Sequence, residues 1–263
     1  MPFTDLGGVR LHHVLEGRAG GPVLVLSHSL GTDHRLWDPQ LPALAGRFRV
    51  LRYDLRGHGA SSVSPAPFDV AALGRDVLSL LDRLGAAQFS FCGLSLGGMI
   101  GMWLGVNAPG RIRRLVLANT SARLAPPGGW DARIAAVEKG GMIAVAGAVL
   151  ERWFTPGFRA ERPAEVERIR AMLLATPPAG YAGACAAIRD MDQRSTLPAI
   201  RAPVLVVAGS ADPATPPADG RFLAQAIPGA RYVELPAAHL SNVEAAEPFT
   251  RAVTRFLSEG EPT

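Results

Sequence analysis

Short runs of hydrophobic residues alternate with helical patterns along most of the chain. Val23–Ser27 is a nearly continuous apolar run between Gly-Pro and a glycine-containing turn, which predicts a fully buried strand. Residues 70–84 instead carry apolar side chains at helical spacing, which predicts an amphipathic helix. By the same criteria we expect further strands at 9–15, 49–53, 87–92, 113–118, 203–208 and 231–235, and further helices at 97–107, 221–226 and 246–258. This alternation is typical of an α/β protein with a mostly parallel central sheet flanked by helices.

The alternation stops in the middle of the chain. Residues 122–195 contain no run that predicts a buried strand, and Gly-Gly, Pro-Gly and Pro-Pro pairs separate their helical segments. The alternation of strands and helices then resumes. We therefore predict a single α/β domain in which residues 1–121 and 196–263 form the core and residues 122–195 are inserted as a helical cap.

One stretch resembles a membrane helix in composition. Residues 89–106 carry no charge, and glycine recurs at every fourth position from Gly93 to Gly105. However, the stretch begins with the alternation of a strand, and the run Gly93-Leu-Ser-Leu-Gly-Gly98 then interrupts it. We interpret it as a strand, a sharp turn and a helix whose glycine face packs closely on the sheet, and we expect no membrane partner.

The turn in this stretch matches the motif G-x-S-x-G. The motif requires a strand before it and a helix after it, and both are predicted here. Its small neighbouring residues permit the strained turn that raises the serine hydroxyl above the sheet, and the first N–H groups of the helix then point at the reacting oxygen. The sequence therefore predicts Ser95 as a nucleophile.

A serine nucleophile needs a base, and the base needs an acid that orients it. The expected order along the chain is Ser, acid, His, and His239 is the only histidine after Ser95. Asp212 follows a predicted buried strand, so it reaches the same edge of the sheet. Some proteins with this motif carry the acid after the preceding strand, but that position here reads Ala-Asn-Thr. We predict a catalytic triad of Ser95, His239 and Asp212.

The oxyanion that forms in such a reaction needs two N–H donors. Leu96, the residue after the nucleophile, supplies one. We expect the other in the loop after Val23–Ser27, where Leu30 follows His28-Ser29, and predict the Leu30 N–H as the second donor. We interpret His28 as a structural hydrogen-bonding residue.

Composition narrows the possible chemistry. Lys139 is the only lysine among 27 basic residues and lies outside any Gly-Lys-Ser/Thr motif, which excludes a P-loop nucleotide binder and a Schiff-base enzyme. The two cysteines and six histidines lack the spacings of a metal site, and His12 and His13 project from opposite faces of a predicted strand. We therefore expect no metal and no cofactor.

A net charge of +4 gives little reason to expect a nucleic-acid partner. The sequence does not open with a signal-peptide pattern, which predicts a cytoplasmic location.

Several short runs match those of known hydrolases. Gly93-Leu-Ser-Leu-Gly97 and Arg56-Gly-His-Gly59 are typical of the α/β-hydrolase superfamily. Ser29-Leu-Gly-Thr-Asp33, Asn119-Thr-Ser-Ala-Arg123 and Arg152-Trp-Phe-Thr155 are narrower. With these runs the chain resembles an α/β-hydrolase along nearly its whole length and, within that superfamily, the 3-oxoadipate enol-lactonases.

The resemblance implies a cofactor-free step in the breakdown of aromatic acids such as protocatechuate and catechol. The substrate would be a small anionic lactone, 3-oxoadipate enol-lactone, which is an unsaturated five-membered ring with an acetate side chain. A Ser-His-Asp acyl-enzyme mechanism would convert it into 3-oxoadipate.

A small anionic substrate needs a compact pocket that carries a cation, and arginine favours bidentate contacts with carboxylates. Arg123 follows a strand end at the catalytic edge of the predicted sheet and is our first candidate, with Arg133 and Arg35 as further candidates. Trp130 and Trp153 are candidate walls of the pocket. Each of these residues is also compatible with a surface position or with the core of the cap.

Other functions on the same frame remain open at this stage. A general carboxylesterase, a cofactor-free perhydrolase or a hydrolase of carbon–carbon bonds would use the same triad, and so would a ligand receptor built on a hydrolase scaffold. A haloalkane dehalogenase is excluded because that chemistry needs an aspartate where Ser95 stands.

Overall fold

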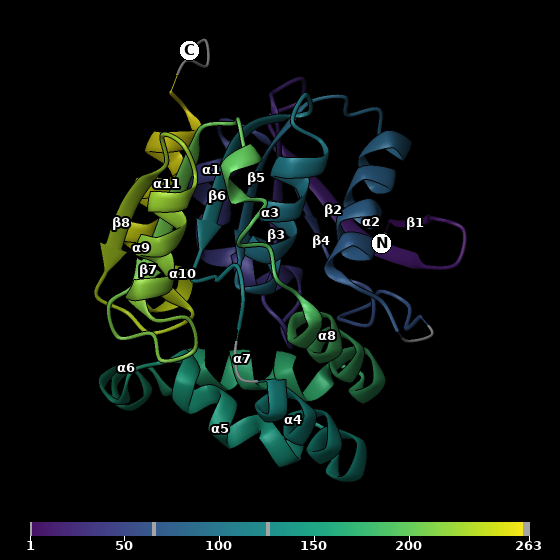
Figure 1. The fold of residues 1–263 in the computed structure, drawn as a ribbon, viewed down its shortest axis with the longest axis vertical. Helices are drawn as coiled ribbons and strands as arrows, with labels where there is room; N and C mark the ends of the chain where they lie inside the picture. Colours follow the sequence, from purple (N-terminus) through teal and green to yellow (C-terminus); the bar gives the residue numbers. More distant parts are fainter. Residues whose placement is uncertain (1, 65–66, 125–126, 260–263) are drawn as a thin grey trace.

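The computed structural model describes residues 2–64, 67–124 and 127–259 (Figure 1). Residues 1, 65–66 and 260–263 of the predicted core, and residues 125–126 of the predicted cap, lie outside the described residues. Within the described ranges an eight-stranded sheet has the order β1-β2-β4-β3-β5-β6-β7-β8. Its strands are Phe3–Asp5 (β1), Arg10–Gly17 (β2), Val23–Ser27 (β3), Arg49–Tyr53 (β4), Phe89–Leu94 (β5), Ile112–Ala118 (β6), Val204–Gly209 (β7) and Arg231–Leu235 (β8).

The sheet is mostly parallel, which confirms the predicted fold class. Neighbouring strands from β4 to β8 run parallel, whereas β1 and β2 add an antiparallel edge. In the central register, Val25 lies opposite Leu51 on one side and Phe91 on the other. Strands β5 and β7 are buried along their whole length. This burial explains why the sequence of β7 is a continuous apolar run, whereas β5 contains the small polar residue Ser90.

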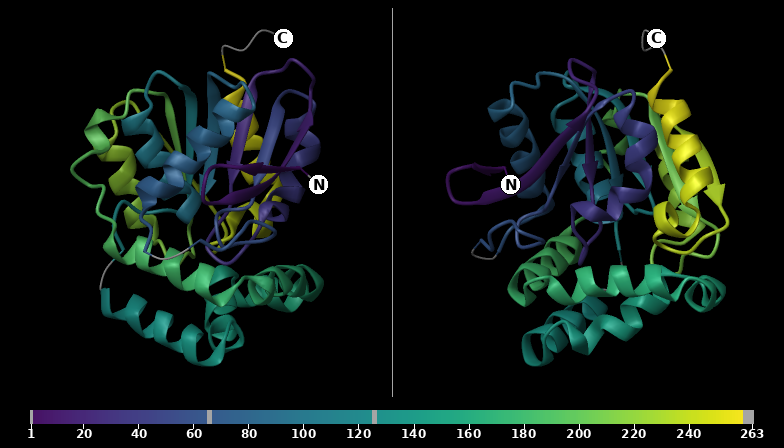
Figure 2. Two further views of the ribbon diagram at one scale, coloured as in Figure 1. Left: turned by 90° about the vertical axis from the view of Figure 1, so that its right-hand side faces the viewer. Right: turned by 180° about the vertical axis from the view of Figure 1, so that it is seen from behind.

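Helices cover both faces of the sheet (Figures 1 and 2). On one face lie α2, α3 and α9, and on the other lie α1 and α11. The bounds of the helices in the core are His34–Gln40 (η1), Leu41–Ala45 (α1), Val70–Arg83 (α2), Leu96–Asn107 (α3), Leu197–Ala199 (η2), Pro217–Ala226 (α9), Ser241–Glu244 (α10) and Ala246–Leu257 (α11).

Helix α3 packs unusually close to the sheet through its glycines. A Cβ atom at Gly97 would lie 2.2 Å from the carbonyl oxygen of Ser27, at the end of β3. One turn further along the helix, a Cβ atom at Gly101 would lie 3.1 Å from side-chain atoms of Leu115 and Leu117 on β6. The four-residue spacing of glycine therefore serves close packing between a helix and a sheet.

Five helices of the described chain lie between β6 and β7 and form a layer below the sheet in Figure 1. They are Pro127–Gly140 (α4), Ile143–Trp153 (α5), Pro156–Glu161 (α6), Pro163–Ala175 (α7) and Pro178–Asp190 (α8). We call this layer the cap. The cap contacts the core at backbone level, because a Cβ atom at Gly180 would lie only 2.1 Å from the carbonyl oxygen of Gly57.

Some predicted elements differ from the observed ones. Strand β1 and the 3-10 helix η1 were not predicted, because β1 has only three residues and η1 contains Pro39 and no regular apolar spacing. Helix α9 begins at Pro217 rather than residue 221, since proline is well accommodated in a first helical turn. Strand β5 extends to Leu94, so it runs directly up to Ser95.

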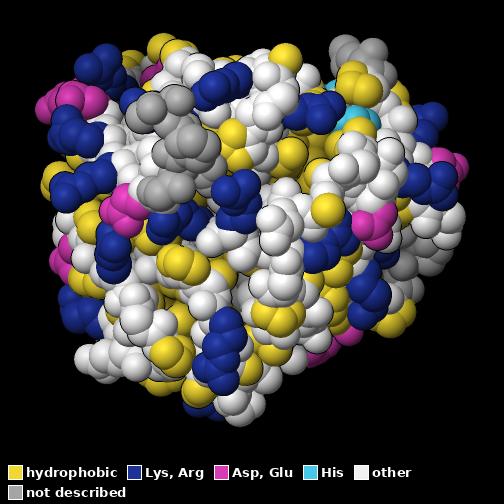
Figure 3. Space-filling view, turned by 90° about the horizontal axis from the view of Figure 1, so that it is seen from above, with side chains coloured by type: hydrophobic (Ala, Val, Ile, Leu, Met, Phe, Trp, Pro, Cys, Tyr) yellow, Lys and Arg dark blue, Asp and Glu magenta, His cyan; other side chains and the backbone are white. Residues whose placement is uncertain are grey.

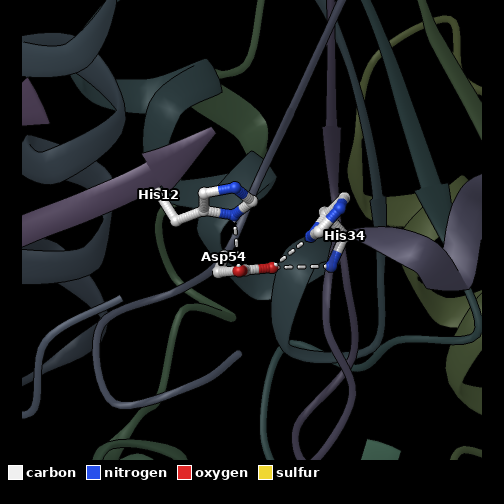
Figure 4. Close-up of side chains that lie close together, drawn as sticks. All are labelled: His12, His34 and Asp54. Atoms are coloured by element: carbon white, nitrogen blue, oxygen red, sulfur yellow. Dashed lines mark hydrogen bonds and ion pairs between the residues drawn. The ribbon is translucent and has the colours of Figure 1, made fainter. Parts of the chain in front are cut away.

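Asp54 connects three segments of the chain (Figure 4). Nδ1 of His12 and Nδ1 of His34 each donate to one of its carboxylate oxygens at 2.8 Å. The N–H groups of His34 and Ala60 donate to the same oxygens. Among the described residues, His12, His34 and Asp54 form the group whose possible metal-ligand atoms, two ring nitrogens and one carboxylate oxygen, lie close enough together to hold a metal ion. A carboxylate only accepts, so both Nδ1 atoms carry hydrogen here, and the cluster connects β2, η1 and the loop after β4 by hydrogen bonds.

In the described ranges, every individual helix is too short or too polar to cross a membrane, although the bent pair α7 and α8 passes a test of length and composition. Figure 3 shows the face opposite the cap, where arginine side chains are dispersed and acidic side chains lie among them.

The glycine contact of α3 gives a stability prediction. Gly97→Ala should destabilise the protein by at least about 2 kcal/mol, because the added Cβ atom must displace backbone at the end of β3. Gly147 is the matched control, since it also lies within a helix but has open space around its Cα atom. Gly147→Ala should be stabilising by up to about 1 kcal/mol. Urea unfolding measures both values, and similar effects of the two substitutions would contradict the prediction.

Candidate active site

Ser95 forms the turn between β5 and α3, with φ of 56° and ψ of −114°. Positive φ is uncommon for a residue with a side chain, and specific contacts hold it here. The N–H of Ser95 donates to the carbonyl of Ala118 at 2.9 Å, and its carbonyl accepts from the Thr120 hydroxyl at 2.7 Å. A Cβ atom at Gly93 would lie 2.1 Å from the carbonyl oxygen of Gly97. The turn is therefore too tight for any residue but glycine at position 93.

His239 and Asp212 lie in loops at the same edge of the sheet. Nδ1 of His239 donates to Oδ2 of Asp212 at 2.8 Å, and both side chains are buried. The N–H groups of Ala214 and Thr215 donate to the other oxygen at 2.8 and 3.0 Å, and the Thr215 hydroxyl donates to Oδ2 at 2.7 Å. With Nδ1 committed to Asp212, Nε2 is the ring nitrogen left to interact with another group.

The partners of Asp212 keep its carboxylate charged. Burial alone would raise the pKa of Asp212, but the charge and hydrogen bond of His239, with hydrogen bonds from Asn119 and the Thr215 amide, lower it to about 2. The carboxylate is therefore ionised at neutral pH, and it is fixed in place by five donors.

Asn119 is a member of this network that sequence reasoning did not identify. It has φ of 44°, and its Nδ2 donates to Asp212 at 3.0 Å and to the carbonyl of Ala238 at 3.2 Å. The Ser241 hydroxyl donates to its Oδ1. The sequence holds one sign of this role, which is that the position after β6 carries an amide and not a carboxylate. That amide, Asn119, supports Asp212, the acid that follows β7.

The loop after β3 is fixed by the carbonyl of Ser29. This oxygen accepts from Nδ1 of His28 at 2.8 Å and from the hydroxyl and N–H of Thr32 at 2.9 and 3.2 Å. Nε2 of His28 accepts from the N–H of Leu55 at 3.0 Å, which places the ring hydrogen on Nδ1. In a trans peptide the C=O and the following N–H point in opposite directions. The N–H of Leu30 therefore points away from these donors.

A cavity of about 290 Å³ lies between these loops and the cap. Ser95, His239 and the Ser29-Leu30 loop line it from the core, and Arg133 and Arg152 line it from the cap. The remaining lining residues include Leu124, Trp130, Val149, Trp153, Tyr181, Ile188, Pro213, Ala214 and Thr215. The candidates Trp130, Arg133 and Trp153 are thus brought together with the predicted triad, and Leu96 is buried beside Ser95.

The cavity requires a correction to the predicted arginines. Arg123 does not line it, and the side chain is 44% exposed and lies 3.8 Å from Asp192. Arg35 pairs with Asp33 at 2.6 Å and borders a different hollow beside His12. The prediction for Arg123 rests on its position after a strand end, but the side chains of Arg123 and Arg35 both lie towards nearby acids instead. The sequence does not predict Arg152 as a binding residue, because it stands out there only as part of the run Arg152-Trp-Phe-Thr155.

The two arginines of the cavity form no ion pair among the described residues. Neither Arg133 nor Arg152 lies within ion-pair distance of a carboxylate in the part of the chain that the structure describes. The guanidinium of Arg133 lies 4.8 Å from the ring of Trp130. Burial lowers the pKa of Arg152, and the charge of Arg133 lowers it further. The cavity therefore combines a serine, a histidine and two arginines that have no ion-pair partner among the described residues, which favours an anionic ligand.

Comparisons with known proteins identify the family to which the chain belongs. A family model described as the alpha/beta hydrolase fold matches residues 22–246. The 3-oxoadipate enol-lactonase 2 of Acinetobacter baylyi is 40% identical over 249 residues, which cover 95% of this chain and 93% of that protein. The crystal structure of the enol-lactonase from Burkholderia xenovorans LB400 has a TM-score of 0.97 and 46% identity, and covers 98% of this chain and 100% of its own. A hydrolase from Pseudomonas aeruginosa PA01 has a TM-score of 0.95 and 52% identity, with 97% of each chain covered.

The histidines around the Ser29 loop predict a pH dependence of stability. Burial lowers the pKa of His28, and burial together with the nearby His28 lowers that of His58 to about 3. A histidine in the unfolded chain takes up a proton below about pH 6.5, whereas His58 stays neutral in the folded protein down to about pH 3. Stability should therefore fall as the pH drops below 6.5, by about 1.4 kcal/mol per pH unit for each such histidine.

His58→Asn isolates one of these contributions. The free energy of unfolding of this variant is measured in urea at several pH values from 6.5 down to 5. Its slope against pH should be smaller than that of the wild type by an amount that corresponds to about one bound proton. Parallel curves for the two proteins would contradict the assignment.

Proposed function

The chain belongs to the α/β-hydrolase family and, within it, to the 3-oxoadipate enol-lactonases, and from this premise we propose that it hydrolyses 3-oxoadipate enol-lactone to 3-oxoadipate. The observation that carries the proposal is the cavity in which Ser95 and His239 face two arginines that lack a carboxylate partner within the described residues. The lactone has an acetate group, whose charge such a cavity compensates, next to an ester bond that a serine can attack. The reaction requires no metal and no cofactor.

In the first half of the reaction, His239 acts as a general base. Its Nε2 takes the proton of the Ser95 hydroxyl, and Oγ of Ser95 attacks the ring carbonyl carbon. The N–H groups of Leu30 and Leu96 stabilise the oxyanion. The ring carbon–oxygen bond then breaks more easily than that of an ordinary ester, because the leaving group is an enolate, and the enolate oxygen takes the proton from Nε2 of His239 to become an enol. This gives an acyl-enzyme that carries the opened chain.

In the second half, water replaces the serine. His239 takes a proton from the water, the resulting hydroxide attacks the acyl carbon, and the released Ser95 oxygen recovers a proton from His239. Asp212 stays ionised throughout, because its low pKa keeps it a carboxylate, and it stabilises the imidazolium that forms in both halves. The released enol converts to the keto form of 3-oxoadipate.

The cap contributes substrate selection. Arg152 and Arg133 bind the acetate group of the substrate, and Trp130 and Trp153 limit the size of the ligand. Removal of one partner from a buried charge pair costs about 2 to 4 kcal/mol, which corresponds to roughly 30- to 1000-fold in rate.

Ser95→Ala tests the nucleophile. We expect a loss of turnover on the order of 10⁴-fold or more, because the triad acts as a unit. Thermal unfolding should change little, since the substitution removes only a hydroxyl. Retention of more than a few per cent of the activity, measured with the enol-lactone, would rule out Ser95 as the nucleophile.

Arg152→Gln tests the anion-binding role of the cap. The value of kcat/KM for the enol-lactone should fall roughly 30- to 1000-fold, while that for the neutral ester p-nitrophenyl acetate should change little. Arg123→Gln is the matched control, because Arg123 lies outside the cavity lining. It should leave both substrates unaffected. Equal losses on both substrates in Arg152→Gln would identify Arg152 as structural, and wild-type protein that hydrolyses the neutral ester as well as the lactone would favour a general esterase.

A further inference from the structure

We propose that Glu244 is a positioning residue that couples the cap to His239. The proposal rests on the proposed hydrolysis, in which His239 is the general base. Glu244 ends the short helix α10, five residues after His239, and it does not line the cavity. Its role would be to transmit the position of the cap to the loop that carries the base.

The carboxylate of Glu244 bridges two distant segments. One oxygen accepts from the N–H of Ala238 at 2.8 Å, immediately before His239. The other accepts from the hydroxyl of Thr155, and the N–H of Thr155 lies 3.3 Å from both oxygens. Thr155 belongs to the cap, and its hydroxyl oxygen also accepts from the N–H of Phe158 at the start of α6. A single carboxylate therefore connects the first turn of a cap helix to the histidine loop.

The other side of His239 is also bound to the cap. The N–H of Leu240 donates to the carbonyl of Trp153 at 3.1 Å. Both residues that flank His239 thus have their N–H groups attached to the segment 153–155, one directly and one through Glu244. Trp153 lines the cavity, and it follows Arg152 directly in the chain.

This arrangement has a mechanistic consequence. The bond to Asp212 orients the imidazole ring, and Asn119 holds the carbonyl of Ala238 from the core, whereas the two flanking N–H groups fix the backbone of His239 from the side of the cap. If segment 153–155 moves away from the core, both anchors are lost together, and His239 loses two of the contacts that hold its backbone in the cavity beside Ser95. The reactivity of Ser95 therefore depends on contact between the cap and the His239 loop. The same part of the cap thus carries Arg152 and helps to position the base.

The test is a double-mutant cycle with a probe that does not need the arginines. Glu244→Gln, Thr155→Val and the double variant are compared for the rate at which a small neutral fluorophosphonate labels Ser95, and for kcat and KM with p-nitrophenyl acetate. Each single substitution should lower the labelling rate and kcat by about 10- to 100-fold with little change in KM, the size expected for a hydrogen bond to a charged group. The double variant should be no worse than the poorer single variant.

Two controls separate positioning from stability. Glu247→Gln removes a neighbouring carboxylate that is 84% exposed and paired with Arg251, and it should change neither rate. Thr155→Ser keeps the hydroxyl, and it should restore both rates relative to Thr155→Val. If Thr155→Val or Glu244→Gln fails to fold, Thr155→Ser and Thr155→Ala still compare a variant that keeps the hydroxyl at position 155 with one that lacks it.

Either of two results would overturn the proposal. One is a double variant whose loss equals the product of the single losses, and the other is a set of variants with lowered melting temperature but unchanged labelling of Ser95. A failure of the proposed function would differ from both, because wild-type protein would then resist labelling or would not hydrolyse the lactone.

Discussion

The contact between Gly97 and the carbonyl of Ser27 is the constraint on which the active site depends. It brings the start of α3 against the end of β3, and the loop 28–30 begins at that point. Ser95 lies two residues before the contact in one segment, and Leu30 lies three residues after it in the other. The contact therefore sets the distance between Ser95, the proposed nucleophile, and the N–H groups that we propose stabilise its oxyanion. Any side chain at position 97 would separate two halves of one site.

Local patterns predict the frame of the protein well. The predicted strands at 23–27, 49–53 and 231–235 agree with the observed bounds. The first is a nearly continuous apolar run because it lies inside the parallel sheet, whereas the last is a partly exposed edge strand that Pro228-Gly229 precedes. The motif around Ser95 is also recognisable locally, since Gly93 packs against the carbonyl of Gly97 within the same turn, although Gly97 itself packs against the distant Ser27. Elements with short or mixed patterns, such as β1 and η1, depend on tertiary contacts and leave little trace in the sequence.

Residues that work across long separations are less predictable. Arg123 was favoured because of its position after a strand, but an adjacent acid, Asp192, draws the side chain outwards. Arg152 faces the cavity because α5 lies across it, and the packing of five cap helices determines that geometry. The same holds for His12, His34 and Asp54, which come from three segments and meet only in the folded chain. Sequence spacing carries no signal for such groups.

The meeting of Gly57 with Gly180 has a consequence for how this scaffold changes over evolutionary time. The cap and the core touch there through backbone alone, so these two glycines limit how closely this end of the cap can approach the core. A cap transplanted from another hydrolase would keep its own helix packing. With any side chain at the contact between Gly57 and Gly180, which we call the seam, it would lie further from Ser95 and enclose a larger space. Diversification of ligand size in this architecture can thus proceed by changing the seam, with the chemistry below it left intact.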